Sequence, residues 1–298
     1  MSTILYYSNF CENCKQVLSV VSRSPVKDEM HFLCVDDRVK GTNGATYIKL
    51  QNGEKVILPP TVSRVPALLL LNRGHHVLFG KDIIKHLATL NVEKGSEVLA
   101  AKLATEVERY DFAIQISKQA SYEKRFYNKY NYPIINTPKV INNKTMPNQE
   151  VVLAIIRQES EFDTRANSWA GARGMMQLMK YTAKIVAKQA KLPYSISRLT
   201  KDPEYNIKLG SYYFNSLMED YNGVYPFAIA AYNAGPNRVK TWRRVNGDPS
   251  KGQLSYVNWI ELIRFKETRN YVQRVLENIN VYKYMLSKEP VKIDSFFN

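Results

Sequence analysis

The pattern of hydrophobic and polar positions differs between the two ends of the chain. Toward the N-terminus, apolar runs of strand length alternate with segments of helical period, which is typical of a small α/β layer. Asn52-Gly53 is a turn sequence inside residues 47–57, where we expect a hairpin. From residue 147 onward no strand-like alternation is sustained, and the pattern predicts an all-α domain. Strands are expected at residues 3–8, 31–36, 66–71 and 77–79, and helices at residues 12–21 and 81–90.

A polar break at residues 91–95 ends the first region. After it, residues 97–105 and 111–127 have helical periodicity, and Pro138 and Pro147 then block helix continuation. We expect this connector to pack on the domain that follows it. The predicted organisation is an α/β domain at residues 1–92, a helical connector at residues 93–146 and an all-α domain at residues 147–298.

One glutamate interrupts an apolar stripe in the first helix of the all-α domain. At helical spacing, Glu159 lies on the face that carries Val152, Ile155, Ile156 and Phe162. Burying a carboxylate while it is charged and alone costs free energy, so Glu159 must be paired, protonated or catalytic. Its position alone leaves a structural and a catalytic role equally open.

Composition is that of a soluble globular protein, since 45% of the 298 residues are hydrophobic and 23% are charged. No apolar run approaches roughly 18 residues, so we expect no transmembrane segment. The first residues lack the basic start, apolar stretch and cleavage site of a signal peptide. The net charge of +15 favours an anionic partner, such as lipid headgroups or an acidic cell wall. Nucleic acid is not expected, because no recognition motif or dense basic run accompanies the charge.

The cysteines are confined to the first third of the chain. Cys11 and Cys14 form a Cys-x-x-Cys pair at a predicted helix N-terminus, where the helix dipole stabilises a thiolate at Cys11. Cys14 is then placed to resolve a mixed disulfide. A zinc site lacks a second ligand pair, and a purely structural cysteine pair remains an alternative. Cys34 is expected to be a small buried hydrophobe.

The order strand, Cys-x-x-Cys, helix and a later Val65-Pro66 before a strand resembles the thioredoxin/glutaredoxin family over residues 1–92. The resemblance implies a cis-proline at Pro66, a redox-capable fold and a dithiol or disulfide protein partner. Two features depart from the family. Phe10 precedes the first cysteine where the family usually has tryptophan or proline, and residues 38–64 lack an obvious second helix.

Four ordered motifs mark the all-α domain: Glu159-Ser160, the glycine-bearing segment 167–179, Ala231-Tyr-Asn-Ala-Gly235 and Glu267-Thr-Arg-Asn-Tyr-Val272. Together with the tyrosine-rich connector, they resemble the soluble lytic transglycosylase family over about residues 98–290. The resemblance implies a goose-lysozyme-like catalytic domain that acts on peptidoglycan glycan strands. Met175 stands where the family has leucine.

The resemblance assigns roles to individual residues. Glu159 matches the family's single catalytic acid/base, and Tyr232 and Asn233 match the pair beside it. Met175 and Met176 would contribute to an apolar pocket that raises the pKa of the glutamate. The remaining positions match residues that bind or shape the saccharide groove: Ser168, Gln177, Met179, Glu267 and Tyr271.

Most glycosidases need a second carboxylate. Here Glu161 lies about 200° around the helix from Glu159, and Asp163 falls at the helix exit, where capping or turn formation is the better assignment. One carboxylate suffices for the reaction that the resemblance implies. The MurNAc N-acetyl group assists, and the sugar's own 6-hydroxyl closes a 1,6-anhydro ring, without metal or organic cofactor. The enzyme would be a lyase of the periplasm or cell envelope.

Two other functions remain open. The chain could be a thiol-disulfide oxidoreductase that carries a cell-wall-binding module, or a wall-associated structural protein in which Glu159 is inert. The aromatic residues are ambiguous as well, because tyrosines in helical domains are more often core residues than sugar-stacking platforms. The aromatic candidates for sugar stacking are Tyr212, Tyr213, Tyr225 and Trp259.

Overall fold

The computed structural model describes residues 3–22, 27–28, 30–42, 44–71, 75–79, 83, 96–106, 108–289 and 296. The chain divides into two compact units, Met1–Pro133 and Ile134–Asn298. Most of the helix predicted at residues 81–90 lies outside the described residues.

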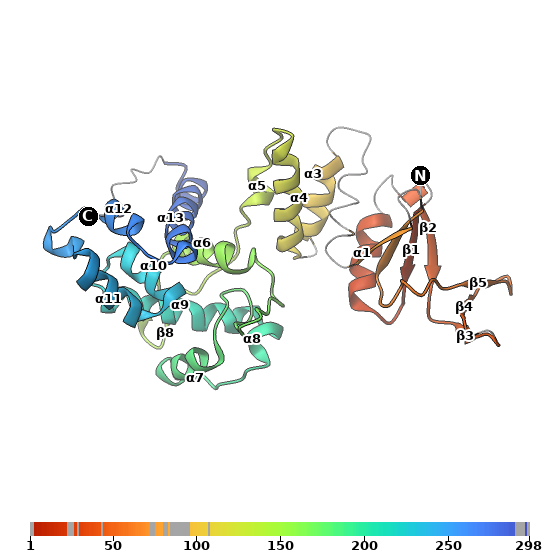
Figure 1. Cartoon of the computed structure of the whole chain (residues 1–298), viewed down its shortest axis with the longest axis horizontal. Coiled ribbons are helices and arrows are strands. Elements are labelled where there is room, and N and C mark those ends of the chain that lie inside the picture. Colours follow the sequence, from red (N-terminus) through yellow and green to blue (C-terminus); the bar gives the residue numbers. More distant parts are fainter. Residues whose placement is uncertain are drawn as a thin grey trace. The chain divides into compact units, whose positions relative to one another are not determined.

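A four-stranded sheet of order β2-β1-β6-β7 organises the first unit (Figure 1). β1 pairs with β2 in parallel and with β6 antiparallel, and β6 pairs antiparallel with β7. Both faces of the sheet are covered. Leu5 and Leu68 contribute to one core cluster with Val17 of α1, while Tyr6 and Leu69 contribute to another. The elements are β1 (Thr3–Tyr7), α1 (Glu12–Ser22), β2 (Met30–Cys34), β6 (Ala67–Leu70) and β7 (His76–Phe79).

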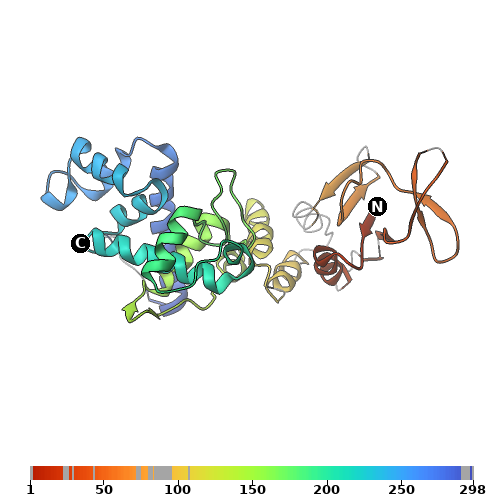
Figure 2. The ribbon, with the colours of Figure 1, turned by 90° about the horizontal axis from the view of Figure 1, so that it is seen from below.

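Residues 38–64, where no second helix was predicted, contain a three-stranded antiparallel sheet. Figure 2 shows it apart from the larger sheet. The predicted hairpin is confirmed as β4 and β5, and the Asn52-Gly53 turn places Gly53 at φ +86°. The additional strand β3 was not predicted. The Val65–Pro66 peptide bond that follows this segment is cis. The strands are β3 (Arg38–Lys40), β4 (Thr46–Lys49) and β5 (Lys55–Ile57).

The connector helices share the core of the first unit, whereas the sequence predicted that they would pack on the domain that follows. Ala104 of α3 and Phe112 and Ile116 of α4 belong to the same apolar cluster as Leu5 of β1 and Val17 of α1. The boundary between the two units therefore falls at Pro133, inside the predicted connector. The helices are α3 (Ser96–Glu106), α4 (Tyr110–Tyr122) and α5 (Asn128–Asn131).

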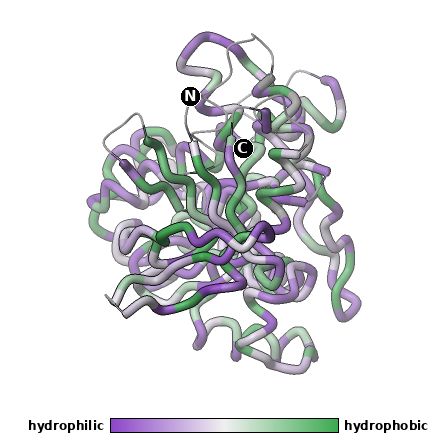
Figure 3. Tube along the Cα trace, turned by 90° about the vertical axis from the view of Figure 1, so that its right-hand side faces the viewer, coloured by the Kyte–Doolittle hydropathy of each residue, from purple (hydrophilic) through white to green (hydrophobic). Residues whose placement is uncertain are grey.

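The second unit is helical, apart from the short strand pair β8 (Val140–Ile141) and β9 (Lys144–Thr145). Hydrophobic and hydrophilic residues follow one another in short runs along the trace of the chain (Figure 3), as expected of elements that bury one face. α10 packs against α9, α11 and α13, and α6 packs against α13. The elements are α6 (Gln149–Ser160), α7 (Lys180–Gln189), α8 (Arg198–Lys201), α9 (Pro203–Asp220), α10 (Tyr225–Ala234), α11 (Pro236–Asn246), η2 (Pro249–Lys251), α12 (Tyr256–Glu261) and α13 (Lys266–Ser287).

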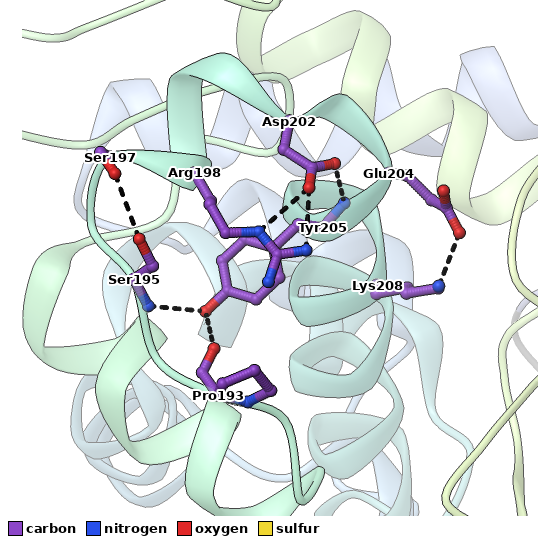
Figure 4. A network of polar contacts seen from close by, with 8 residues as sticks. All are labelled: Pro193, Ser195, Ser197, Arg198, Asp202, Glu204, Tyr205 and Lys208. Carbon is purple, nitrogen blue, oxygen red and sulfur yellow. Dashed lines mark hydrogen bonds and ion pairs between the residues drawn. The ribbon is translucent and has the colours of Figure 1, made fainter.

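A polar network fixes the start of α9 (Figure 4). The Asp202 side chain caps the helix by accepting from the backbone N–H of Tyr205 over 3.0 Å, and Pro203 stands in the first turn. The Tyr205 hydroxyl donates to the Pro193 carbonyl over 2.9 Å. Arg198 pairs with Asp202 and lies 4.2 Å over the Tyr205 ring. α9 is thereby anchored to the loop that precedes it.

No helix among the described residues is both long enough and apolar enough to cross a bilayer. In that same part of the chain, His, Cys, Asp and Glu side chains form no cluster of three or more that could hold a metal ion.

Candidate active site

Glu159 occupies the last turn of α6. Residues 151–156 of this helix are buried on all sides, so the apolar surface is wider than the predicted stripe. The helix stops directly after Ser160, because Glu161 and Phe162 adopt left-handed φ values of 52° and 67°. Glu159 therefore projects from a rigid, buried helix at the point where the backbone turns away. Its side chain is surrounded by protein atoms on most sides yet remains partly exposed to solvent.

Burial raises the pKa of Glu159 from 4.5 to about 7, because the protein surroundings disfavour the charged carboxylate. A hydrogen bond from Tyr271 opposes this rise, and the negative charge of Glu267 adds to it. The Tyr271 hydroxyl donates to Glu159 Oε1 over 2.7 Å. A substantial fraction of molecules therefore carries a protonated Glu159 near neutral pH.

The buried Tyr271 and the half-buried Tyr232 flank the carboxyl group. Burial raises the pKa of Tyr271 and of Tyr232 well above the ordinary value of 10, and the charge of Glu159 raises both further. Both phenols consequently stay protonated. Tyr271 donates to Glu159, whereas Tyr232 donates to the Met176 carbonyl over 2.8 Å.

The glycine-bearing loop forms one wall of the site. Met175 and Met176 are buried, as the predicted apolar pocket requires. The Ser160 hydroxyl donates to the Met175 carbonyl over 2.8 Å, and Tyr232 holds the next carbonyl. Hydroxyl groups from α6 and α10 thus fix two consecutive peptide groups beside Glu159.

Asn206 of α9, which the sequence analysis missed, holds this loop from the other side. Its fully buried amide accepts from the Met176 N–H over 2.8 Å and donates to the carbonyls of Arg173 and Leu199 over 2.9 and 3.0 Å. Gly174 (φ +74°) passes so close that a Cβ would lie 2.0 Å from the Leu199 carbonyl oxygen.

Gly210, one turn after Asn206, makes room for Met176. A Cβ at this glycine would lie 2.3 Å from the Met176 sulfur. One sequence feature could have indicated Asn206 and Gly210: a polar side chain and a glycine stand four residues apart on the buried face of α9.

Three of the predicted saccharide-binding residues lie in or at the end of this loop. The Ser168 hydroxyl accepts from the Ala172 N–H over 2.9 Å, so it stabilises the loop's own turn. Gln177, at φ +46°, donates its side-chain amide to the Gly174 carbonyl over 2.8 Å. Met179 is exposed at the N-cap of α7.

The fourth motif brings a second carboxyl group near Glu159. Asn233 Nδ2 donates to Glu267 Oε1 over 3.5 Å, and Asn233 Oδ1 accepts from the Thr268 hydroxyl over 2.6 Å. This chain of contacts joins the end of α10 to the start of α13. The helix-exit carboxylate Asp163 has the predicted turn role, since it accepts from the Arg165 N–H over 3.0 Å.

The other aromatic candidates are mainly core residues. Trp259 is fully buried and lies 4.7 Å from Phe227, measured between ring centroids. Tyr212 is buried as well and donates to the Gln189 carbonyl over 3.2 Å. The half-buried Tyr213 lies 5.2 Å from Tyr232, measured between ring centroids, so it packs against one of the tyrosines beside Glu159.

The first unit contains a separate cysteine site. Cys11 is partly exposed and donates to the Val65 carbonyl over 3.7 Å, at the rim of a cavity of ≈ 210 Å³. Cys14 is fully buried, and burial raises the pKa of its thiol to about 12. Pro66 follows Val65, so the cis bond lies beside Cys11.

Cys34 differs from the prediction. It is partly exposed rather than buried, and its thiol donates to Asp36 Oδ2 over 3.2 Å. It also accepts from the Asn9 side chain over 3.4 Å. The error arose because β2 ends at Cys34, where the sheet gives way to polar loops.

Comparisons with known proteins match the second unit. Residues 137–254 match the family described as "Transglycosylase SLT domain". The soluble lytic murein transglycosylase of Escherichia coli K12 is 38% identical over 150 residues, which are 50% of this chain and 22% of that protein. A putative soluble lytic murein transglycosylase of Haemophilus influenzae is 40% identical over 147 residues, 48% of this chain and 23% of that protein. The chain thus spans less than a quarter of the length of these curated relatives.

Solved structures agree with the sequence matches. The 70 kDa soluble lytic transglycosylase of Escherichia coli aligns with a TM-score of 0.61 and 30% identity, covering 70% of this chain and 33% of that one. Lytic transglycosylase Slt of Pseudomonas aeruginosa aligns with a TM-score of 0.57 and 32% identity over the same shares. That structure is of an inactive mutant in which one glutamate is replaced by glutamine. The second unit is therefore similar in sequence and in fold to the transglycosylase domain of soluble lytic transglycosylases.

Proposed function

We propose that this chain is a peptidoglycan lytic transglycosylase that cleaves the MurNAc–GlcNAc β-1,4 bond and leaves 1,6-anhydro-MurNAc ends. The observation that carries the proposal is the environment of Glu159, whose pKa is raised by burial to about 7 in a domain similar to known transglycosylases. A carboxyl group with this pKa can donate a proton at neutral pH and accept one later in the same cycle.

Glu159 first donates its proton to the glycosidic oxygen, and the bond between that oxygen and C1 of MurNAc breaks. The N-acetyl group of the same sugar stabilises the positive charge that develops at C1. Tyr271 stabilises the new carboxylate through its 2.7 Å hydrogen bond. The carboxylate then removes the proton of the 6-hydroxyl, whose oxygen attacks C1 and closes the anhydro ring. No water is consumed, and Glu159 ends the cycle protonated.

Glu267 has a supporting role in this scheme. Its negative charge raises the pKa of Glu159, which favours the protonated form that begins the cycle. The hydrogen bond from Asn233 holds its carboxylate in place. We assign the groove that receives the glycan to the motif residues: Ser168, Met175, Gln177, Met179, Tyr232, Asn233, Glu267 and Tyr271.

The proposal assigns catalysis to residues 147–298, with residues 93–146 as a connector and residues 1–92 as a thioredoxin-like domain. The substrate would place the reaction in the periplasm or cell envelope. The alternative, an oxidoreductase whose second unit only binds the cell wall, is not favoured. The proteins that the second unit resembles are named as lytic transglycosylases.

The test is Glu159→Gln in the full chain, incubated with purified peptidoglycan, with the soluble products identified by mass spectrometry. Wild type should release 1,6-anhydro-muropeptides, and the variant should release none while its melting temperature is no lower than that of wild type. Glu161→Gln, two residues along the chain, is the matched control and should remain active. Activity in Glu159→Gln, or products that carry only reducing ends, would rule the proposal out.

A second activity is supported by the cysteine site. We propose that Cys11 attacks a disulfide of a protein partner and that Cys14 resolves the mixed disulfide, so two thiols are oxidised as one disulfide is reduced. The partly exposed Cys11 beside a cavity, above a buried Cys14, favours this order of attack. Cys11→Ser should abolish disulfide reductase turnover with dithiothreitol as reductant, whereas Cys34→Ser should retain it. Equal turnover in the two variants would contradict the proposal.

A further inference from the structure

Trp169 lies on the same loop as the active-site wall but belongs to none of the contacts described so far. Its side chain is fully exposed, whereas Trp242 and Trp259 are 5% and 0% exposed. Aromatic side chains normally bury roughly 150–250 Å² on folding. An indole that forgoes this burial is available for a ligand.

A hydrogen-bonded hairpin presents the indole. At its base, the Gly174 N–H donates to the Ala166 carbonyl over 2.8 Å, and the Ser168 N–H donates to the Ala172 carbonyl over 2.9 Å. At its tip, the Gly171 N–H closes the turn onto the Ser168 carbonyl over 2.9 Å. Trp169 is the residue directly after Ser168, so its backbone is fixed before any ligand arrives.

The base of the hairpin is the wall of the active site. Gly174, whose N–H closes the hairpin, lies against Leu199 and Asn206 and is followed by Met175, which holds Ser160 beside Glu159. Trp169 is two residues beyond Asn167, which bridges to Arg173. At about 3.3 Å per residue, the tip lies roughly 7 Å beyond that bridge. The hairpin thus connects Trp169, through Gly174 and Met175, to the loop that contacts Ser160 beside Glu159.

The surroundings of the indole suit a sugar ring better than a protein partner. Its chain neighbours are the exposed Ala170 and the partly buried Ser168, so the tip of the hairpin itself does not provide the apolar area that a protein interface requires. A pyranose ring presents C–H groups on one face, and these complement the negative face of an aromatic ring.

We propose that Trp169 forms a saccharide subsite in which the indole stacks on a pyranose ring of the glycan strand, outside the residues that touch the scissile bond. This inference rests on the proposed function for the identity of the strand. It predicts that strands long enough to reach the hairpin bind more tightly than disaccharides. The contact acts on binding and leaves the chemistry at Glu159 unchanged.

Fluorescence tests binding independently of catalysis. The full-length Glu159→Gln variant is titrated with soluble strands of alternating GlcNAc and MurNAc, while calorimetry measures binding in parallel. Of the three tryptophans only Trp169 is exposed, so its emission should shift to shorter wavelength on binding. The shift should be absent in the Glu159→Gln/Trp169→Phe double variant, which keeps a ring for stacking. Binding without a shift, or no binding, would overturn the inference.

Kinetics provide the second readout. Trp169→Ala should raise KM for these strands by about 2- to 12-fold, the equivalent of one aromatic contact, with kcat within about twofold of wild type. Tyr122→Ala removes an aromatic side chain that is 81% exposed in the first unit and should leave both constants unchanged. An unchanged KM in Trp169→Ala would refute the subsite while leaving the role of Glu159 intact. The proposed function fails separately, if wild type releases no anhydro products.

Discussion

Replacing Tyr271 with phenylalanine removes the hydroxyl group that donates to Glu159, the proposed catalytic acid, and keeps the buried ring. In the wild type this hydroxyl donates to Glu159 Oε1 over 2.7 Å. The bond lowers the pKa of Glu159 and so partly offsets burial, which raises it; with both effects the pKa is about 7. The bond stabilises the charged carboxylate more than the neutral acid. Its loss therefore leaves burial and the charge of Glu267 unopposed, and the pKa of Glu159 rises.

The size of the effect follows from the strength of the bond. A hydrogen bond to a charged group contributes about 1.5 kcal/mol at the lower end of the usual range, and about 1.4 kcal/mol corresponds to one pH unit. The alkaline limb of the kcat/KM profile, which reports the acid in the free enzyme, should move upward by about one pH unit. At about pH 6, kcat should fall roughly tenfold, because the same bond stabilises the carboxylate that forms during proton transfer.

The assay is the initial rate of release of soluble anhydro-muropeptides between about pH 4 and pH 9. Activity of the wild type should decline as the pH rises through about 7, where Glu159 loses its proton. Glu267→Gln is the matched opposite change, since removing a negative charge should move the alkaline limb downward. An alkaline limb that stays in place or moves downward in Tyr271→Phe would refute this account of the carboxyl group.

Three further predictions concern stability. Since the pKa of Glu159 is raised in the folded state, the free energy of unfolding of wild type should fall by up to about 3 kcal/mol as the pH rises from 4.5 to about 7. In urea unfolding, Glu159→Gln should therefore become more stable relative to wild type from about pH 5 to about pH 8. A difference in stability that stays constant with pH would contradict this. Gly174→Ala should destabilise the protein by about 3 kcal/mol or more, because its Cβ would lie 2.0 Å from the Leu199 carbonyl oxygen. Gly171→Ala is the control: its Cβ would have no atom within 4 Å, so the backbone strain should cost only about 1 kcal/mol. Similar melting temperatures for the two variants would argue against the close approach at Gly174. Asn206→Ala removes three buried hydrogen bonds and should lower stability by about 3 kcal/mol and reduce activity, and unchanged activity would show that the loop holds its shape without it.

Glu159, the centre of the candidate site, could be identified from the sequence because a carboxylate stands among apolar residues on one helix face. A glutamate at an apolar helical position is visible from spacing alone, and the four motifs supply its neighbours in order. The structural matches confirm the fold of the second unit and its similarity to lytic transglycosylases. The thioredoxin-like assignment of residues 1–92 stays a prediction, although the peptide bond before Pro66 is cis, as the resemblance implied.

The residues that were missed act over long sequence separations. Asn206 contacts Met176, 30 residues away, and one buried asparagine in an amphipathic helix has no local pattern that reveals its partners. Trp169 was missed for a different reason. Its side chain is fully exposed, and exposure cannot be read from residue type. The sequence left Trp259 open as a sugar-stacking residue or a core residue, and it is buried against Phe227. Burial of an aromatic ring depends on which helices meet, and spacing along one helix does not determine this.

The hydrogen bond from Tyr271 also makes the two oxygens of the Glu159 carboxyl group inequivalent. Since the phenol donates to Oε1, that oxygen acts as acceptor, and the acidic proton resides on Oε2. The tyrosine thereby selects one tautomer of the carboxylic acid, as a carboxylate selects the tautomer of a histidine in other enzymes. In the proposed reaction, proton delivery thereby acquires a fixed side, and the glycan strand approaches with its bridging oxygen toward Oε2.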